Sequence, residues 1–334
     1  MHRRGASLAI VIMPRYVQTN NQRKVQRAGK GSLKQRQIGK RCVVRYTAAL
    51  GRFFFLIPYL FGAWASTWED RDLQVGAYVE LLWSEGEARS MAGDLLSALQ
   101  WHYSVRKVLT GSWQKFKTWS RLEPCAQVLP LPISALFAIV GYAISIGDIE
   151  FAAGVYLAFH CMLRTGELLE LELSQIRQGD GTMILVLPDT KTTKRHGQTE
   201  YVDVECPIAK LLVRLLLRRR GAGGRLISCS PYFFRKRWQE CMVALQLDPA
   251  HFAPYSLRRG GATHDFSVHV SFDRALTRGR WQCIRTARIY VRQGEEALAR
   301  IAFSVVQQRN FAQWSEFLRG HVLKLEVQFQ STCP

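Results

Sequence analysis

Apolar residues recur at intervals of three and four in the first part of the chain, which is the spacing of a helix with one buried face. Val44, Ala48, Leu50 and Phe54 give this pattern to residues 41–60. The same spacing predicts three more helices, at residues 72–82, at 90–103 and beginning at 114. The first part of the chain therefore predicts a small all-helical unit.

The second part of the chain mixes helical and strand patterns. A Pro-rich stretch at residues 129–132 predicts a linker, because consecutive X-Pro pairs disfavour helix. Helices are then expected at residues 133–146, 150–162, 208–220, 232–245, 256–265 and 300–325, and strands at 183–187 and 200–204. The expected fold class is mainly α, with an N-terminal helical bundle followed by an α+β domain that contains a small antiparallel sheet.

Charge indicates the class of partner. The chain has 46 Lys and Arg against 26 Asp and Glu, a formal net charge of +20, and its 48% hydrophobic share is typical of a globular protein. Such an excess usually binds a polyanion, most often the phosphates of nucleic acid. Residues 1–68 contain 13 Lys and Arg and no acid, and residues 1–40 read as a flexible basic tail. A basic RNA-binding scaffold would show the same excess.

Cysteine usage and apolar runs bear on the compartment. The eight cysteines are scattered without metal-ligand spacing, so we expect reduced thiols in an intracellular protein and no zinc site. The apolar run at residues 7–13 is short for a signal peptide. The run at residues 53–65 contains Pro58 and is below membrane-spanning length. We therefore expect no membrane segment.

Candidate chemistry lies in separated segments of the second part. Arg164 lies between a buried helix and the start of the next helix. Its planar guanidinium group can hold two phosphate oxygens at once. Arg258 stands at a helix start, where free N–H groups also favour anions. Tyr290 lies among arginines, nine residues after Trp281. A phenol has a pKa near 10 and is a poor nucleophile unless cations stabilise the charge that it develops.

These pieces, in this order, resemble the tyrosine recombinases, also called the phage-integrase family. The family's first box is matched by Arg164, Gly166, Glu167 and Leu168. Its second box, His-x-Leu-Arg with Ala-Thr soon after, is matched by Tyr255, Leu257, Arg258, Ala262 and Thr263. Trp281 precedes Tyr290 by the family's spacing, and Lys191 matches the hairpin lysine, with Lys194 as the reserve.

The resemblance implies an organisation into five segments: a disordered basic tail at 1–40, a helical, SAM-like core-binding DNA domain at 41–126, a linker at 127–132, a catalytic domain at 133–310, and a C-terminal helical or tail segment at 311–334. It implies double-stranded DNA as partner, homodimers or homotetramers on DNA, and no cofactor or metal. The expected location is with DNA, in the nucleus of a eukaryote or the cytoplasm and nucleoid of a bacterium. The basic tail and the RRGGAT variant are similar to eukaryotic mobile-element recombinases.

The resemblance also implies a role for each matched residue. Tyr290 would attack a DNA phosphodiester to give a 3′-phosphotyrosyl bond, while Arg164 and Arg258 hold the non-bridging oxygens. Lys191 would act as general acid, and Trp281 would donate its indole N–H near the phosphate. Glu167 would orient the arginines. Six more basic residues are expected to contact DNA: Arg89, Lys107, Lys115, Lys194, Arg195 and Arg259.

One residue departs from the family's pattern. Tyr255 stands where the second box has His, and a phenol can donate a hydrogen bond but cannot carry a positive charge. This leaves open a catalytically weakened or inactive DNA-binding relative, and also a type IB topoisomerase-like activity. His264 is interpreted as a packing residue, and Arg280, Arg285, Arg288 and Arg292 as surface charge.

Overall fold

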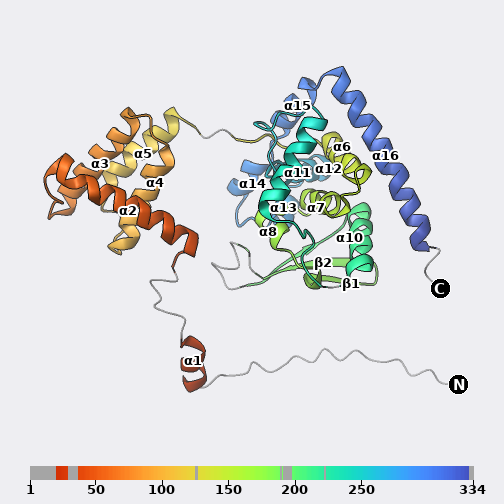
Figure 1. The fold of residues 1–334 in the computed structure, drawn as a ribbon, viewed down its shortest axis with the longest axis horizontal. Helices are drawn as coiled ribbons and strands as arrows, with labels where there is room; N and C mark the ends of the chain where they lie inside the picture. Colours follow the sequence, from red (N-terminus) through yellow and green to blue (C-terminus); the bar gives the residue numbers. More distant parts are fainter. Residues whose placement is uncertain are drawn as a thin grey trace. The chain divides into compact units, whose positions relative to one another are not determined.

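The structure is a computed structural model that describes residues 20–28, 37–124, 127–188, 190, 198–221 and 223–330. Its contacts divide the chain into two compact units, Met1–Cys125 and Ala126–Pro334. Figure 1 labels most of the helices and strands. Each unit is described by itself.

Helices α2 to α5 of the first unit pack around one apolar core. Their bounds are α2 (Lys40–Phe61), α3 (Trp68–Ser84), α4 (Arg89–His102) and α5 (Thr110–Leu122). α2 lies against α4, α3 lies against α5, and Phe53 and Leu96 are fully buried in the core. The carboxylate of Asp72 on α3 accepts the N–H groups of Gly111 (2.8 Å) and Ser112 (2.9 Å) at the start of α5. The helical pattern of the sequence thus predicted this unit correctly.

Two features of the N-terminal region differ from the sequence prediction. The stretch expected to be a flexible tail includes α1 (Asn20–Arg27) among its described residues, which are rich in Gln, Arg and Lys, all good helix formers. α2 extends over 22 residues from Lys40. By length and composition alone, this helix is long and apolar enough to cross a membrane. Within the unit, however, Leu50, Phe53 and Ile57 of α2 are buried in the core.

The second unit is built around α6 (Ile133–Ser145) and α7 (Ile149–His160), with α12 (Ser256–His269) packed on α7. Glycines permit this close approach. A Cβ atom on Gly260 would lie 2.3 Å from the carbonyl oxygen of Leu131, and one on Gly261 would lie 1.9 Å from that of Phe159. The small residues of α12 therefore bring its first turns against the C-terminal end of α7.

A small antiparallel sheet belongs to the second unit. Its strands β1 (Ile176–Gly179), β2 (Thr182–Leu187) and β3 (Glu200–Asp203) pair in the order β1-β2-β3. β2 and β3 were predicted, whereas β1 was missed because Ile176 is its one large apolar residue. The register pairs Leu187 with Glu200, so these two residues close the base of the loop between β2 and β3.

The C-terminal helix α16 (Val305–Gln330) lies along α6 (Figure 1). Trp314 packs its ring on Tyr142, with the ring centroids 5.6 Å apart, and its carbonyl oxygen occupies the space that a Cβ on Gly141 would need. α16 is continuous across residue 310, so the expected boundary between a catalytic domain and a C-terminal segment falls inside one helix. α16 continues past residue 310 because its apolar face covers α6 and completes the core there.

Further helices among the described residues of the second unit are α8 (Thr165–Glu170), α10 (Pro207–Arg220), α11 (Pro231–Ala244), α13 (Phe272–Gly279), α14 (Ile284–Tyr290) and α15 (Gln293–Ala302). The short helices α13 to α15 were not predicted, because segments of seven to ten residues carry too few apolar repeats. The expected fold class is confirmed: the protein is mainly α, with a helical first unit and an α+β second unit.

Candidate active site

Arg258 is the buried centre of the site. It lies in the first turn of α12, its side chain is 0% exposed, and its guanidinium donates to the carbonyl oxygens of Met162 and Gly279, the latter at 2.6 Å. Burial, followed by the positive charges of Arg280 and Arg164, lowers the pKa of Arg258 to about 10. The loop after α7 and the end of α13 thus fix a guanidinium in a place with little water.

Arg164 and Glu167 form the second part of the site, at the start of α8. Glu167 accepts the backbone N–H of Arg164 at 2.9 Å and also pairs with its guanidinium. The same carboxylate lies 4.0 Å from Arg258 and accepts a 2.6 Å hydrogen bond from Arg280. Burial alone would raise the pKa of Glu167, but Arg280, Arg164 and Arg258 overcome it and hold that pKa below its ordinary value. Glu167 is therefore a shared anion between three guanidinium groups.

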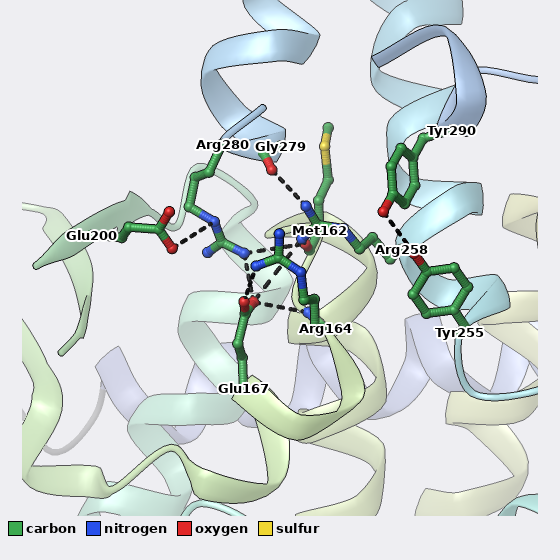
Figure 2. A network of polar contacts seen from close by, with 9 residues as sticks. All are labelled: Met162, Arg164, Glu167, Glu200, Tyr255, Arg258, Gly279, Arg280 and Tyr290. Carbon is green, nitrogen blue, oxygen red and sulfur yellow. Dashed lines mark hydrogen bonds and ion pairs between the residues drawn. The ribbon is translucent and has the colours of Figure 1, made fainter. Parts of the chain in front are cut away.

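Two phenols meet beside this cluster. The hydroxyl oxygens of Tyr255 and Tyr290 lie 2.6 Å apart (Figure 2). Burial raises the pKa of Tyr255 to about 12, helped by the hydrogen bond to Tyr290. For Tyr290, burial would also raise the pKa, but the hydrogen bond from Tyr255 and the charges of Arg258 and Arg164 outweigh it and lower that pKa. The direction of these shifts means that Tyr290 ionises before Tyr255, and that the Tyr290 phenolate then accepts the hydrogen bond from the Tyr255 hydroxyl.

Trp281 and Thr263 fix the position of Tyr290. The indole of Trp281 is stacked on the phenol ring, with centroids 4.6 Å apart, and Arg258 lies over both rings. Thr263 of α12 donates to the carbonyl oxygen of Tyr290 at 3.2 Å and accepts the N–H of Arg292 at 3.1 Å. Helix α14 therefore ends with its tyrosine held by side-chain stacking on one side and by backbone hydrogen bonds on the other.

The structure brings six of the predicted residues together: Arg164, Glu167, Tyr255, Arg258, Trp281 and Tyr290. Figure 2 shows all of them except Trp281. The indole N–H of Trp281 is buried and has no hydrogen-bond partner among the described residues. Three predicted residues, Lys191, Lys194 and Arg195, lie outside the described residues.

Other predicted DNA contacts lie elsewhere. Arg259 is 5% exposed at its side chain and donates to the carbonyl oxygen of Val128 at 2.8 Å, so its guanidinium is engaged within the protein. The same guanidinium donates to the side-chain oxygen of Gln127 and lies 4.0 Å from the carboxylate of Glu295. Arg89, Lys107 and Lys115 belong to the first unit, where Lys115 pairs with Glu80 at 3.1 Å and Lys107 is exposed.

Arg280 was expected to be surface charge, and the structure corrects this. Its side chain is 7% exposed, it donates to Glu167, and its Nε lies 3.6 Å from the carboxylate of Glu200 on β3. In the sequence, Arg280 is distinguished only by its position directly before Trp281. The residues around it show no pattern that predicts burial. His264 fits the packing interpretation, since its ring lies against Phe159 at 5.9 Å between centroids.

The arrangement can bind a phosphodiester and polarise it. Guanidinium groups from α8 and α12 converge beside a tyrosine hydroxyl whose pKa is lowered, which is the combination that covalent catalysis by a phenol requires. Among the described residues, no group of three or more His, Cys, Asp or Glu side chains is placed to hold a metal ion.

Comparison with solved structures identifies the fold. The XerH site-specific recombinase bound to a palindromic difH substrate matches 80% of this chain and 81% of its own, with 12% identity and a TM-score of 0.58. A lambda integrase dimer bound to a COC′ core site, residues 75–356, matches 78% and 92%, with 15% identity and a TM-score of 0.55. A lambda integrase tetramer bound to a Holliday junction matches 81% and 75%, with 16% identity and a TM-score of 0.52.

The chain therefore has the tyrosine recombinase and integrase fold, as the sequence motifs predicted. No protein-family model and no curated protein matches it.

Proposed function

We propose that this protein cleaves and rejoins double-stranded DNA as a site-specific recombinase or integrase, with Tyr290 as the nucleophile. The observation that supports this most directly is the position of the Tyr290 hydroxyl. Its oxygen lies 2.6 Å from the hydroxyl oxygen of Tyr255, and the Tyr290 ring lies within 5.2 Å of the Arg258 guanidinium. A fold shared with XerH and lambda integrase structures supports the same activity.

The first step is attack of the Tyr290 oxygen on the phosphorus of one strand. Arg164 and Arg258 bind the non-bridging oxygens and stabilise the charge that these oxygens gain in the transition state. Tyr255 stays protonated, because its pKa is raised to about 12, and donates a hydrogen bond to the attacking oxygen or to the phosphate. The phenolic proton of Tyr290 leaves to water.

The bond from phosphorus to the 5′ oxygen then breaks, and a 3′-phosphotyrosyl bond remains. The departing 5′ oxygen needs a proton, and Lys191 supplies it under this proposal, by resemblance to the family's hairpin lysine. Attack of a 5′ hydroxyl from another strand on the phosphotyrosine reverses these steps, so the bond energy is conserved without a nucleotide cofactor. The enzyme would act on DNA as dimers that pair into tetramers, with phosphate contacts dominating affinity.

The test uses the full chain and a pool of nicked suicide duplexes with a randomised central sequence. After denaturation, the expected result is a covalent protein–DNA adduct, with the DNA attached at Tyr290 when the modified peptide is mapped by mass spectrometry. The variant Tyr290→Phe is the matched control and should give no adduct. Recovered DNA would also identify the preferred sequence, which serves the later experiments.

The other outcomes identify the rival functions. Binding to duplex without any adduct would refute the enzymatic proposal and favour a recombinase-like DNA-binding protein, for which the Tyr255 replacement is the supporting observation. An adduct together with plasmid relaxation, but without exchange between two duplexes, would favour a type IB topoisomerase-like activity. Attachment at Tyr255 in place of Tyr290 would refute the assignment of the nucleophile.

A further inference from the structure

Arg280 occupies a place that its backbone does not favour. It has a left-handed backbone conformation with φ 56° directly after α13, a region in which glycine is the residue without steric cost. The preceding Gly279 has no space for a Cβ, which would lie 2.1 Å from the Trp281 ring. This tight turn directs the Arg280 side chain into the protein.

The buried guanidinium of Arg280 lies between two carboxylates, as Figure 2 shows. Its Nη2 donates to Glu167 at 2.6 Å and reaches the carbonyl oxygen of Met162 at 3.4 Å, while its Nε lies 3.6 Å from Glu200. The side chains of Glu167 and Glu200 are 7% and 13% exposed. Because water is largely excluded, these charges act on one another strongly.

The charge balance of the cluster depends on this residue. Arg164, Arg258 and Arg280 supply three positive charges against the two negative charges of Glu167 and Glu200. One positive charge therefore remains for a phosphodiester. Without Arg280 the cluster would be neutral, and Glu167 would compete with the phosphate for both remaining arginines.

Arg280 also connects the cluster to the sheet. Glu200 is the first residue of β3 and is paired in register with Leu187, so the ion pair ties the base of the β2–β3 loop to the site. The Nη1 and Nε atoms of Arg280 and the paired oxygen of Glu200 are buried without hydrogen-bond partners among the described residues. The contact is thus electrostatic more than directional.

We propose that Arg280 is a positioning residue that neutralises Glu167 and Glu200, so that Arg164 and Arg258 keep their positive charge for the scissile phosphate. This role rests on the proposed function and adds to it a residue outside the family's motif set. Arg280 acts through its neighbours and does not itself contact the DNA.

The test compares three variants with the parent chain on the selected suicide duplex. Arg280→Met should lower the rate of adduct formation at saturating DNA about 10- to 100-fold, while the Kd for duplex changes less than about threefold. The double variant R280M/E200Q removes one charge of each sign and should recover the rate to within about threefold of the parent. Glu200→Gln alone raises the net charge of the cluster and should not slow cleavage.

Each outcome bears on the inference. A folded R280M that cleaves like the parent overturns it, and so does a folded R280M/E200Q that stays as slow as R280M. Thermal melts check that each variant folds. If R280M does not fold, the double variant decides alone: a folded R280M/E200Q that cleaves at least tenfold slower than the parent overturns the inference. Absence of any adduct from the parent chain would instead refute the proposed function.

A second readout does not require cleavage. The ionisation of Tyr290 is measured from the absorbance difference between each protein and its Tyr290→Phe partner. Among the residues that the structure describes, the charged or titratable groups that act on Tyr290 are Tyr255, Arg258 and Arg164. Arg280→Met should move the titration to higher pH, and R280M/E200Q should return it; an unchanged titration in R280M contradicts the inference.

Discussion

The hydrogen bond between Tyr255 and Tyr290 makes the substitution Tyr255→Phe informative, because it removes one donor and little volume. The bond joins two hydroxyl oxygens 2.6 Å apart and favours the phenolate of Tyr290. A hydrogen bond to a charged group contributes about 1.5–3 kcal/mol. Tyr255 is 38% exposed, so water competes for the same oxygen, and the lower end of that range applies.

This magnitude sets the expected shift. About 1.4 kcal/mol corresponds to about one pKa unit and to about a tenfold change in rate. The pKa of Tyr290 lies below its ordinary value, and loss of the donor raises it, because the burial that opposes ionisation remains. In the variant, the rising limb of the cleavage rate should therefore move to higher pH by about one unit.

The assay is adduct formation at saturating suicide duplex, measured between about pH 6 and pH 9.5. The upper limit follows from Arg258, whose pKa is lowered to about 10 by burial, so that its charge would begin to be lost. On the rising limb the variant should be about tenfold slower than the parent at the same pH, with the difference shrinking once Tyr290 is ionised in both proteins. Tyr232→Phe, on an exposed tyrosine of α11, is the matched control and should leave the profile unchanged.

The shape of the pH profile shows whether the Tyr255 hydroxyl donates its hydrogen bond to the Tyr290 oxygen or to the phosphate. A uniform loss of rate at every pH would mean that Tyr255 donates only to the phosphate, and it would refute the reasoning from the Tyr290 pKa. An unchanged rate would remove Tyr255 from the mechanism. Tyr255→His, which restores the motif residue, should cleave at least as fast as the parent because an imidazole donates and can also carry charge.

Three further predictions concern packing, ion pairing and DNA affinity. Gly261→Ala should destabilise the protein by about 3 kcal/mol or more in urea denaturation, since its Cβ would lie 1.9 Å from the Phe159 carbonyl oxygen; Gly320→Ala, with open space on α16, should instead stabilise it by about 0.5–1 kcal/mol. Glu167 has a lowered pKa, so its contribution to stability is present above its unfolded pKa of about 4.5 and is lost as the pH falls through the folded value. The urea midpoints of the parent and Glu167→Gln should therefore differ at pH 7 and converge toward pH 3, and a constant difference would contradict the ion-pair assignment. Lys107→Ala should reduce the slope of log K against log salt by about 0.9 if this exposed lysine neutralises one phosphate, and an unchanged slope in duplex titrations would exclude that contact.

The sequence by itself determined the fold class, and it named most of the residues that the structure brings together around Tyr290. Helical periodicity over ten or more residues predicted the bundle of the first unit and the buried helices α6 and α7, because burial of one face leaves a regular record in the chain. The order of Arg164, Arg258, Trp281 and Tyr290 predicted the fold that the structural comparison identified.

Tertiary structure decided the features that have no local pattern. α13, α14 and β1 are too short to show a period, and they form because neighbouring segments cover them. Arg259 and Arg280 each have other arginines close by in the sequence. Their burial depends on partners that only the fold supplies: Gln127 and Val128 for Arg259, and Glu167 and Glu200 for Arg280. The contact between Tyr255 and Tyr290 joins residues 35 positions apart, so only the folded chain brings these hydroxyls together and makes one phenol a donor to the other.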